Sequence, residues 1–292
     1  MGCKIVYNNT VTYKKDGVIF MSLNENLNNE WGNFEQLTER LCERLKDLPP
    51  LTKVEKERLE MELDVIRQTH TADLFLQLVD TMYALKDTGA VFHGLIHGSY
   101  ICYLLGLTKI NPLEYGLPFE RFYHTDRKMF PTVHIAVLRD KKALAEEILS
   151  KKLTRFEYVV EEAKIGECRH FTEEEIYKKA LQYFRERGIS LGGQYQGNKL
   201  AEEIFSKTDG RYIYQSQFFE ICTKILGVSN KRADDFRKRL AIRRMSDREA
   251  IKQFFIWKLD EDGAALFDYI YTSHPFVVSK AYILGILFLD FD

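Results

Sequence analysis

The stretch Phe119–Leu138, FERFYHTDRKMFPTVHIAVL, decides the fold of the middle of this chain. Its first half is polar and predicts a loop, and its second half alternates in the manner of a β-strand that begins after Pro131. Side chains alternate sides along a strand, so one face is expected to pack in the core, with Val133, Ile135 and Val137. The opposite face is expected to point outward, with Thr132, His134 and Ala136. That outward face carries a hydroxyl, an imidazole and a methyl group, and no carboxylate.

The segments that flank this strand predict a small sheet. Residues 140–152, DKKALAEEILSKK, have a helical pattern, and residues 155–162, RFEYVVEE, alternate like a second strand. A strand, a helix and a strand form a right-handed crossover when the two strands are parallel. Near the start of the chain, residues 4–22 alternate around NN and KDG, which predicts a hairpin or a meander.

Helical patterns dominate the residues before the strand. Residues 33–48 place leucines on one stripe, which predicts an amphipathic helix. Thr52, with Glu55 three residues later, has the pattern of a capping box at the start of a second helix. Residues 72–89 predict a further helix, and residues 91–107 predict a glycine-punctuated loop that leads into an apolar helix.

The chain after Thr172 is helical in pattern, starting with a capping box and including the basic segment 231–245, KRADDFRKRLAIRRM. The apolar segment Phe276–Phe291 is interrupted by Lys280, so we predict a buried helix or strand pair there and not a membrane span. The whole pattern predicts an α+β fold, with a mixed sheet followed by a mainly helical domain. The expected divisions are an N-terminal hairpin and helix at 1–50, a sheet domain at 51–170 and a helical domain at 171–292.

The composition is that of a soluble globular protein. The 292 residues are 45% hydrophobic and 29% charged, with a formal net charge of -1, so no overall charge attracts nucleic acid or membrane. The five cysteines are scattered with no C-x-x-C spacing, which argues against a disulfide framework or a cysteine zinc site. We therefore expect a cytoplasmic protein with reduced thiols, no membrane association and only local electrostatic functions.

Several segments resemble one protein family. Residues 55–122, and above all YLLGLTKINPLEYGLPFERF at Tyr103–Phe122, are similar to the bacterial DNA polymerase III alpha subunit family. In that family this segment precedes the motif P-D-x-D-x-D. Later, YIYQSQFFEICTKILGVSNKRADDFRKRL at 212–240 and FVVSKAYILGILF at 276–288 resemble two parts of the family's fingers domain. The resemblance implies that 51–170 is a palm of nucleotidyltransferase type and that 171–292 is a fingers-like domain.

The resemblance gives the outward face of the strand a specific meaning. In the family, the aspartates of the motif hold the two Mg²⁺ ions that drive nucleotidyl transfer. Here Pro131 is kept, while the aspartate positions are occupied by Thr132, His134 and Ala136. An imidazole and a methyl group cannot bridge two hard magnesium ions, and the third acid of the family has no recognised counterpart here. The catalytic site therefore looks degenerate, which leaves enzymatic activity open and favours its absence.

Other family positions predict contacts with phosphate. Glycines and a serine persist in the loop that cradles phosphate in the family, although its arginine-glycine-serine core appears as His93-Gly94-Leu95. Residues 224–258 hold 11 Lys or Arg against 4 Asp or Glu, with Phe236, Phe254, Phe255 and Trp257 among them. Basic residues among aromatic residues suit nucleic-acid binding, whereas the alternative is a solvated helix face with its aromatic residues in the core. The candidate phosphate or nucleic-acid contacts are Gly94, Gly98, Ser99, Lys231, Arg232, Arg237, Lys238, Arg243, Arg244 and Lys280.

Two further constellations are alternatives for metal chemistry. If the glycine-rich loop packs against the strand as in the family, three histidines meet there and form a transition-metal site, with His93, His97 and His134. Carboxylates on or after the second strand would supply a relocated catalytic site, with Glu157, Glu161 and Glu162. The simpler interpretation is that the histidines are unrelated and the acids lie at an exposed strand end, so our first expectation is no metal site.

Three functional hypotheses follow. The leading one is a catalytically inactive DNA polymerase III alpha-like protein, without a cofactor, that binds DNA, a nucleotide phosphate or a replication or repair protein. The second is a divergent nucleotidyltransferase or polymerase fragment with relocated Mg²⁺ ligands. The third is a protein-binding scaffold that forms a homodimer. The modules that surround this core in the family have no counterpart in the sequence, so a processive replicase is not expected.

Overall fold

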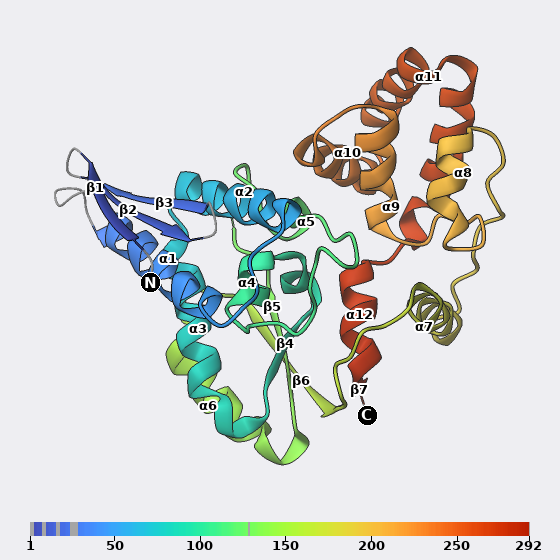
Figure 1. Cartoon of the computed structure of the whole chain (residues 1–292). Coiled ribbons are helices and arrows are strands. Elements are labelled where there is room, and N and C mark those ends of the chain that lie inside the picture. The colour runs from blue at the N-terminus through green and yellow to red at the C-terminus, as the bar shows by residue number, and fades with distance from the viewer. Residues whose placement is uncertain (1–2, 8–9, 16–17, 24–28, 128, 292) are drawn as a thin grey trace. The chain divides into compact units, whose positions relative to one another are not determined.

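The protein divides into two compact units, each described here by itself. The structure is a computed structural model that describes residues 3–7, 10–15, 18–23, 29–127 and 129–291 (Figure 1). Unit 1 comprises residues 1–115, 122–166 and 289–292, and unit 2 comprises residues 116–121 and 167–288. The N-terminal residues 1–50 thus belong to the same unit as the segment that follows them.

Unit 1 holds two sheets and five complete helices (Figure 1). An antiparallel meander has the order β1-β2-β3, and a mixed sheet has the order β4-β5-β6-β7. The strands are β1 (Cys3–Tyr7), β2 (Thr10–Lys15), β3 (Val18–Leu23), β4 (Val91–His93), β5 (Val133–Val137), β6 (Tyr158–Ile165) and β7 (Leu289–Phe291). The helices are α1 (Asn29–Leu45), α2 (Lys53–Thr69), α3 (Ala72–Ala84), α4 (Tyr100–Leu104) and α6 (Lys142–Lys152), with short turns η1 (Lys86–Thr88), η2 (Gly94–Gly98) and η3 (Arg139–Lys141). The predicted meander is confirmed, while its predicted turns at 8–9 and 16–17 lie outside the described residues.

The mixed sheet is built around β5. Its three aliphatic residues Val133, Ile135 and Val137 are buried, as their alternation predicts. β5 pairs in parallel with β6, and α6 connects the two strands, so the predicted strand–helix–strand crossover is present. On its other edge β5 pairs antiparallel with β4, a strand of 3 residues that the sequence analysis assigned to a loop. So short a strand gives no alternation to detect.

A buried carboxylate joins α2 to the start of α4. Glu62 has a fully buried side chain, and its oxygens accept hydrogen bonds from the backbone N–H groups of Tyr100 (2.7 Å) and Ile101 (3.0 Å) and from the Ser99 hydroxyl (2.7 Å). Arg58, one turn earlier in α2, donates to Glu62 (2.6 Å) and to the carbonyl of Gly98 (2.6 Å). The negative charge is therefore paired and also lies at the amino end of a helix, where N–H groups need an acceptor.

Helix starts agree with the sequence. At Thr52 the hydroxyl accepts from the backbone N–H of Glu55, and the Glu55 carboxylate accepts from the backbone N–H of Thr52. The same reciprocal arrangement joins Thr172 and Glu175 at the start of the first helix of unit 2. Both predicted capping boxes are confirmed, and each is worth about 0.5–2 kcal/mol.

Unit 2 is helical, so the predicted α+β class with a mixed sheet and a mainly helical region is confirmed. Its elements are α5 (Phe119–Phe122, shared with unit 1 at its last residue), α7 (Glu173–Glu186), α8 (Lys199–Ser206), α9 (Gln215–Glu220), the π-helical turn η4 (Ile221–Ile225), α10 (Asn230–Ile242), α11 (Met245–Ser273), η5 (His274–Phe276) and α12 (Lys280–Phe288). Within the described ranges, no helix combines the length and the apolar character that crossing a bilayer requires.

The basic segment 231–245 is two helices and not one. α10 ends at Ile242, and Arg243 follows in the left-handed conformation with φ of 59°. Arg244 then precedes α11 in an extended conformation. An α-helix does not continue through a left-handed residue, so the helical pattern of 231–245 is interrupted at Arg243 and Arg244. The two arginines lie at a corner between helices.

The buried carboxylate of α2 provides a test of what holds unit 1 together. Glu62→Gln keeps the shape of the side chain but removes its charge and places an NH₂ group among N–H donors. We expect the free energy of unfolding to fall by about 3–5 kcal/mol, because Arg58 keeps a mostly buried charge without its partner. Urea unfolding followed by circular dichroism measures the change.

The matched control is Glu57→Gln in the same helix. Glu57 pairs with Lys53 at 3.7 Å, and both side chains are exposed. Loss of such a pair changes the free energy of unfolding by about 0–1 kcal/mol. Equal effects of the two substitutions would contradict the stabilising role given to Glu62.

Candidate functional site

The outward face of β5 is less exposed than its sequence suggests. Thr132 and His134 are partly exposed, but Ala136 is fully buried at 0% exposure. Ala136 pairs with Val91 of β4 on one side and with Glu161 of β6 on the other, so it lies in the middle of the sheet. Ala136 thus lies on the same face as His134, as the alternation predicts, but it is buried there and not exposed to solvent.

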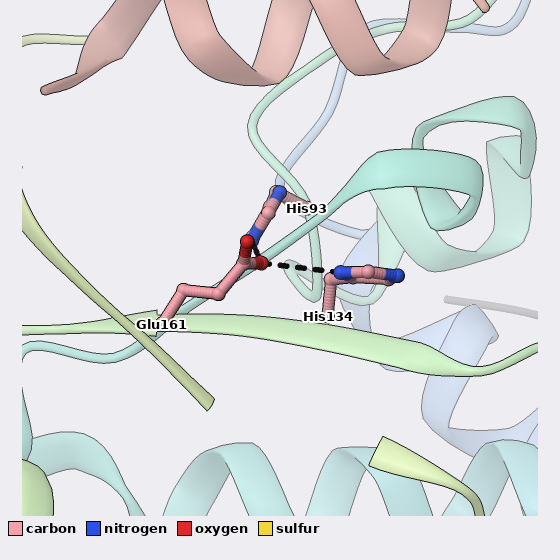
Figure 2. Close-up of side chains that lie close together, drawn as sticks. All are labelled: His93, His134 and Glu161. Carbon is pink, nitrogen blue, oxygen red and sulfur yellow. Dashed lines mark hydrogen bonds and ion pairs between the residues drawn. The ribbon is translucent and has the colours of Figure 1, made fainter. Parts of the chain in front are cut away.

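Three strands bring two imidazoles and a carboxylate together on this face. His93 of β4 is directly opposite His134 of β5, and their ring centroids are 5.5 Å apart. Figure 2 shows the Glu161 carboxylate of β6 joined by dashed lines to one nitrogen of each ring. One oxygen of Glu161 lies 2.9 Å from Nε2 of His93 and 3.1 Å from Nδ1 of His134. These three residues form one polar cluster, called the His93 cluster below.

The His93 cluster favours an ionised carboxylate. The hydrogen bond from His93 lowers the pKa of Glu161, burial opposes this effect, and the hydrogen bond from His134 adds to it. The net pKa lies below the ordinary value of a glutamate. An ionised Glu161 carboxylate lies within ion-pair distance of both rings and is also the form that binds cations.

His97 lies apart from the His93 cluster in its interactions. Its ring is buried, and its Nδ1 forms a hydrogen bond with the hydroxyl of Thr108. Burial and, to a smaller extent, the neighbouring His93 lower the pKa of His97 to about 3, so His97 stays neutral. Of the three histidines considered together in the sequence, the structure thus joins His93 and His134 with Glu161 as the third member.

The remaining acids of β6 are separated by its alternation. The Thr132 hydroxyl donates to Glu157 at 3.3 Å, near the beginning of the strand. Glu162 follows Glu161, so its side chain lies on the opposite face of β6. There it pairs with Lys142 and Arg139, which lower the pKa of its carboxyl. The three acids considered for a relocated catalytic site therefore have three different sets of partners.

The predicted phosphate loop is already bonded within unit 1. Gly94 has φ of +79°, a conformation that suits glycine, and the loop continues through Gly98 to Ser99 at the amino end of α4. The N–H groups that follow Ser99 are hydrogen-bonded to the carboxylate of Glu62. A phosphate at this place would have to displace Glu62.

Part of the predicted basic surface is neutralised inside unit 2. Arg237 and Lys238 both pair with the buried carboxylate of Asp234, at 2.9 Å and 2.7 Å. Lys280 is buried as well and pairs with Glu173 at 2.7 Å, which joins α12 to α7. Each of these three cations has a carboxylate partner within unit 2, but Arg237 and Lys238 share the single negative charge of Asp234.

Other cations lie on the surface. The side chains of Lys231, Arg232, Arg243 and Arg244 are exposed. Among the described residues, Arg232, Arg243, Arg244 and Lys258 have no acidic partner in an ion pair. Their charge is available to a ligand from solution.

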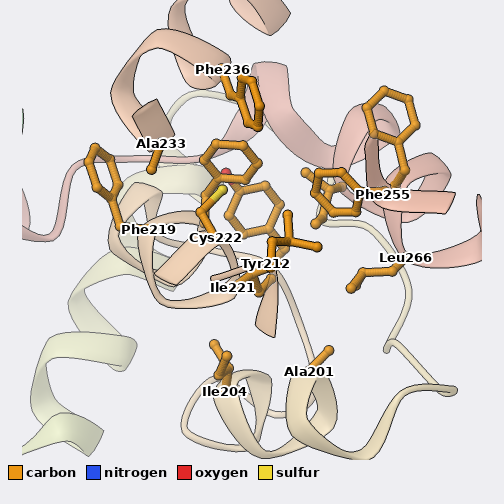
Figure 3. Close-up of a cluster of buried hydrophobic side chains, with 14 of the residues drawn as sticks. Ala201, Ile204, Tyr212, Phe219, Ile221, Cys222, Ala233, Phe236, Phe255 and Leu266 are labelled. Carbon is orange, nitrogen blue, oxygen red and sulfur yellow. The ribbon is translucent and has the colours of Figure 1, made fainter. Parts of the chain in front are cut away.

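The four aromatic residues of this region have two different roles. Phe236 and Phe255 are buried and belong to the core of unit 2, as Figure 3 shows. Phe254 is partly buried, and its ring centroid lies 5.5 Å from that of Phe236 and 5.7 Å from that of Trp257. Trp257 is 71% exposed. The row of rings thus leads from the core to the surface.

Two cations lie over the last two rings of this row, Phe254 and Trp257. The Arg232 guanidinium lies 4.7 Å from the centroid of the Phe254 ring, and the Lys258 ammonium lies 4.7 Å from that of Trp257. We call Arg232, Phe254, Trp257 and Lys258 the Trp257 surface. Residues 254–258 were seen in the sequence as basic and aromatic, but only the structure separates the exposed ring from the buried ones.

Comparison with known proteins places the chain in a family. Residues 33–218 match the family described as the bacterial DNA polymerase III alpha NTPase domain. The match begins in α1 and ends in α9, so it includes β5, β6 and the His93 cluster.

Individual relatives agree with this match. The chain is similar to the DNA polymerase III subunit alpha of Ureaplasma parvum (33% identity over 105 residues, 35% of the chain and 11% of the relative). It is also similar to those of Mycoplasma genitalium (32% over 136 residues, 46% and 15%) and Staphylococcus aureus (26% over 202 residues, 64% and 18%). The matched segments thus span less than a fifth of the length of these relatives. Because the family match covers more than half of the residues, the chain belongs to the family of the bacterial DNA polymerase III alpha NTPase domain.

Proposed function

We propose that this protein binds single-stranded nucleic acid on the Trp257 surface and does not carry out the two-metal nucleotidyl transfer of a polymerase. The exposure of Trp257, with Lys258 over its ring and Arg232 over the ring of the neighbouring Phe254, is the observation that carries the binding part of the proposal. The residue types and spacing on β5 and β6 support the second part. Membership of a DNA polymerase family agrees with a nucleic-acid ligand.

The chemistry of the Trp257 surface suits bases and phosphates together. Proteins that hold single strands combine aromatic rings, on which bases stack, with cations that follow the phosphate backbone. Trp257 offers an indole face to solvent, and Phe254 lies beside it. Arg232 lies over the Phe254 ring and Lys258 over the Trp257 ring, and neither has an acidic partner among the described residues. Each stacked base contributes about 1–3 kcal/mol in such sites.

The exposed ring is not explained by packing within unit 2. Phe255, two residues before Trp257 in α11, packs in the core at 0% exposure, whereas Trp257 is 71% exposed. A single exposed aromatic side chain is common on protein surfaces, so the cations beside Trp257 and Phe254 are what point to a ligand here. The cations make nucleic acid the preferred ligand, because its phosphates complement them.

The β5 face argues against polymerase chemistry by its residue types. Two magnesium ions in nucleotidyl transfer are about 3.5–4 Å apart and need carboxylates that bridge them. The positions that carry aspartates in the family's motif hold Thr132, His134 and Ala136. The carboxylates next to them are Glu157, just before β6, and Glu161 within β6, and these are four residues apart, or roughly 13 Å at about 3.3 Å per residue. One pair of ions cannot be bridged across that distance.

Removal of the indole tests the binding surface. We expect Trp257→Ala to weaken the affinity for a fluorescein-labelled single-stranded oligonucleotide by about 5- to 100-fold, which corresponds to the loss of about 1–3 kcal/mol of stacking. Fluorescence anisotropy at several salt concentrations measures the affinity, which is expected to fall as salt rises.

Tyr83 offers a matched control in unit 1. It is 72% exposed, and the Lys86 ammonium lies 5.1 Å from its ring centroid. Tyr83→Ala is expected to leave the affinity unchanged. Binding that is absent, independent of salt, or equally reduced by both substitutions would contradict the proposal.

A primer-extension assay tests the catalytic part. With a primed template, deoxynucleoside triphosphates and Mg²⁺, we expect no extension above that of a reaction without protein, because the face of β5 offers no bridging carboxylates. Extension that requires Mg²⁺ and is abolished by Glu161→Gln would support a relocated catalytic site and would contradict our proposal.

A further inference from the structure

The His93 cluster has a donor set that the proposed nucleic-acid binding does not use. Its members come from three adjacent strands, β4, β5 and β6. His93 and His134 face each other in the ladder, and Glu161 is the ladder partner of Ala136, two residues beyond His134 on the same face. The Glu161 side chain extends back toward the rings, as Figure 2 shows.

The distances in this cluster are close to those of a coordination sphere. Nitrogen and oxygen ligands bind Zn²⁺ at about 2.0–2.2 Å, so two ligands of one tetrahedral ion lie about 3.3–3.5 Å from each other. The Glu161 oxygen lies 2.9 Å from His93 Nε2 and 3.1 Å from His134 Nδ1, and the three ligand atoms all lie within 4.8 Å of one another. Small side-chain rotations that move the Glu161 oxygen a few tenths of an ångström away from each nitrogen would bring these two distances to those of an ion's ligands.

We propose that His93 Nε2, His134 Nδ1 and a carboxylate oxygen of Glu161 form a binding site for one transition-metal ion of the zinc type. In the described part of the chain, this is the one group of three histidine, cysteine or acidic side chains with suitable spacing. Two imidazoles and one carboxylate are ligands that suit Zn²⁺, Co²⁺ or Ni²⁺, whereas Mg²⁺ prefers oxygen ligands alone. The site thus differs in ion and in ligands from a pair of magnesium ions held by aspartates.

The site is closed to solvent on the side of His93 and open to solvent on the side of His134 and Glu161. The His93 side chain is fully buried, while those of His134 and Glu161 are 35% and 29% exposed. An ion therefore has access from solvent, and three protein ligands leave a coordination position for water or for a ligand. A structural zinc site is typically closed by four protein ligands, so this arrangement is of the open kind.

The glycine after His93 helps to position the second ring. Gly94 turns the chain with φ of +79°, and a Cβ atom there would lie 3.7–3.8 Å from atoms of His134. The His134 ring therefore packs against this turn and is held beside His93. A metal ion at this place would connect β4, β5 and β6 and stabilise the sheet in proportion to its affinity.

Metal binding is tested with the whole chain and with the ions alone. We expect Zn²⁺ to bind at one equivalent per chain in isothermal titration calorimetry and to raise the melting temperature, and Mg²⁺ to do neither. Co²⁺ is expected to give visible absorption bands of nitrogen and oxygen coordination, without the near-ultraviolet band of thiolate ligands.

Two ligand variants and one control locate the site. His134→Ala and Glu161→Gln are each expected to weaken Zn²⁺ affinity by about tenfold or more. Glu162→Gln changes the neighbouring acid, which pairs with Arg139 and Lys142, and is expected to leave the affinity unchanged. Because His134 is partly exposed, its alanine variant is expected to fold, and circular dichroism checks this for all three variants.

The possible results separate clearly. Absence of Zn²⁺ binding by the unaltered chain, thiolate bands with Co²⁺, or equal affinity in His134→Ala and the unaltered chain would each overturn the proposal. Trp257→Ala is expected to leave Zn²⁺ affinity unchanged. The metal site and the nucleic-acid surface are therefore tested independently of each other.

Discussion

The parallel pairing of β5 with β6 is the constraint on which the polar face of unit 1 depends. Side chains alternate with a period of two, so the register that buries Val133, Ile135 and Val137 also fixes what the opposite face carries. A shift by one residue would exchange the two faces of the strand. The same register places Glu161 beside Ala136 and within reach of His134. Packing of the sheet and assembly of the His93 cluster are therefore a single structural outcome.

Internal carboxylates explain which charges of this protein remain available. Glu62 occupies the N–H groups at the start of α4, Asp234 compensates Arg237 and Lys238, and Glu173 compensates Lys280. Positions that the family resemblance linked to phosphate are thus bonded within their own unit. Arg232 and Lys258 have no such partner among the described residues, and they lie over the Phe254 ring and the exposed Trp257 indole, respectively. Charge and aromatic surface coincide at one place in unit 2.

Sequence patterns predicted the parts of the fold that depend on local periodicity. The alternation of 133–137, the crossover through α6 and the capping boxes at Thr52 and Thr172 are all present. β4 was missed because 3 residues carry no measurable period. The corner at Arg243 was missed because a left-handed arginine has no sequence signal comparable to a glycine.

The candidate sites needed contacts between distant segments. The three members of the His93 cluster were each named in the sequence, but the strand pairing that brings Glu161 to the two histidines was not predictable from it. Nor was the contact of His97 with Thr108, which separates His97 from the cluster. Likewise, the sequence grouped Phe255 with Trp257, although one is buried and the other exposed.

The most direct measurement is the fluorescence of Trp257 during titration with single-stranded DNA. The chain has 2 tryptophans, so Trp31→Phe leaves Trp257 as the only emitter. Stacking of a base on the exposed indole is expected to quench its emission in a saturable manner, with the same apparent affinity as anisotropy reports and with recovery at high salt. Binding detected by anisotropy without any change in Trp257 emission would contradict the placement of nucleic acid on this surface.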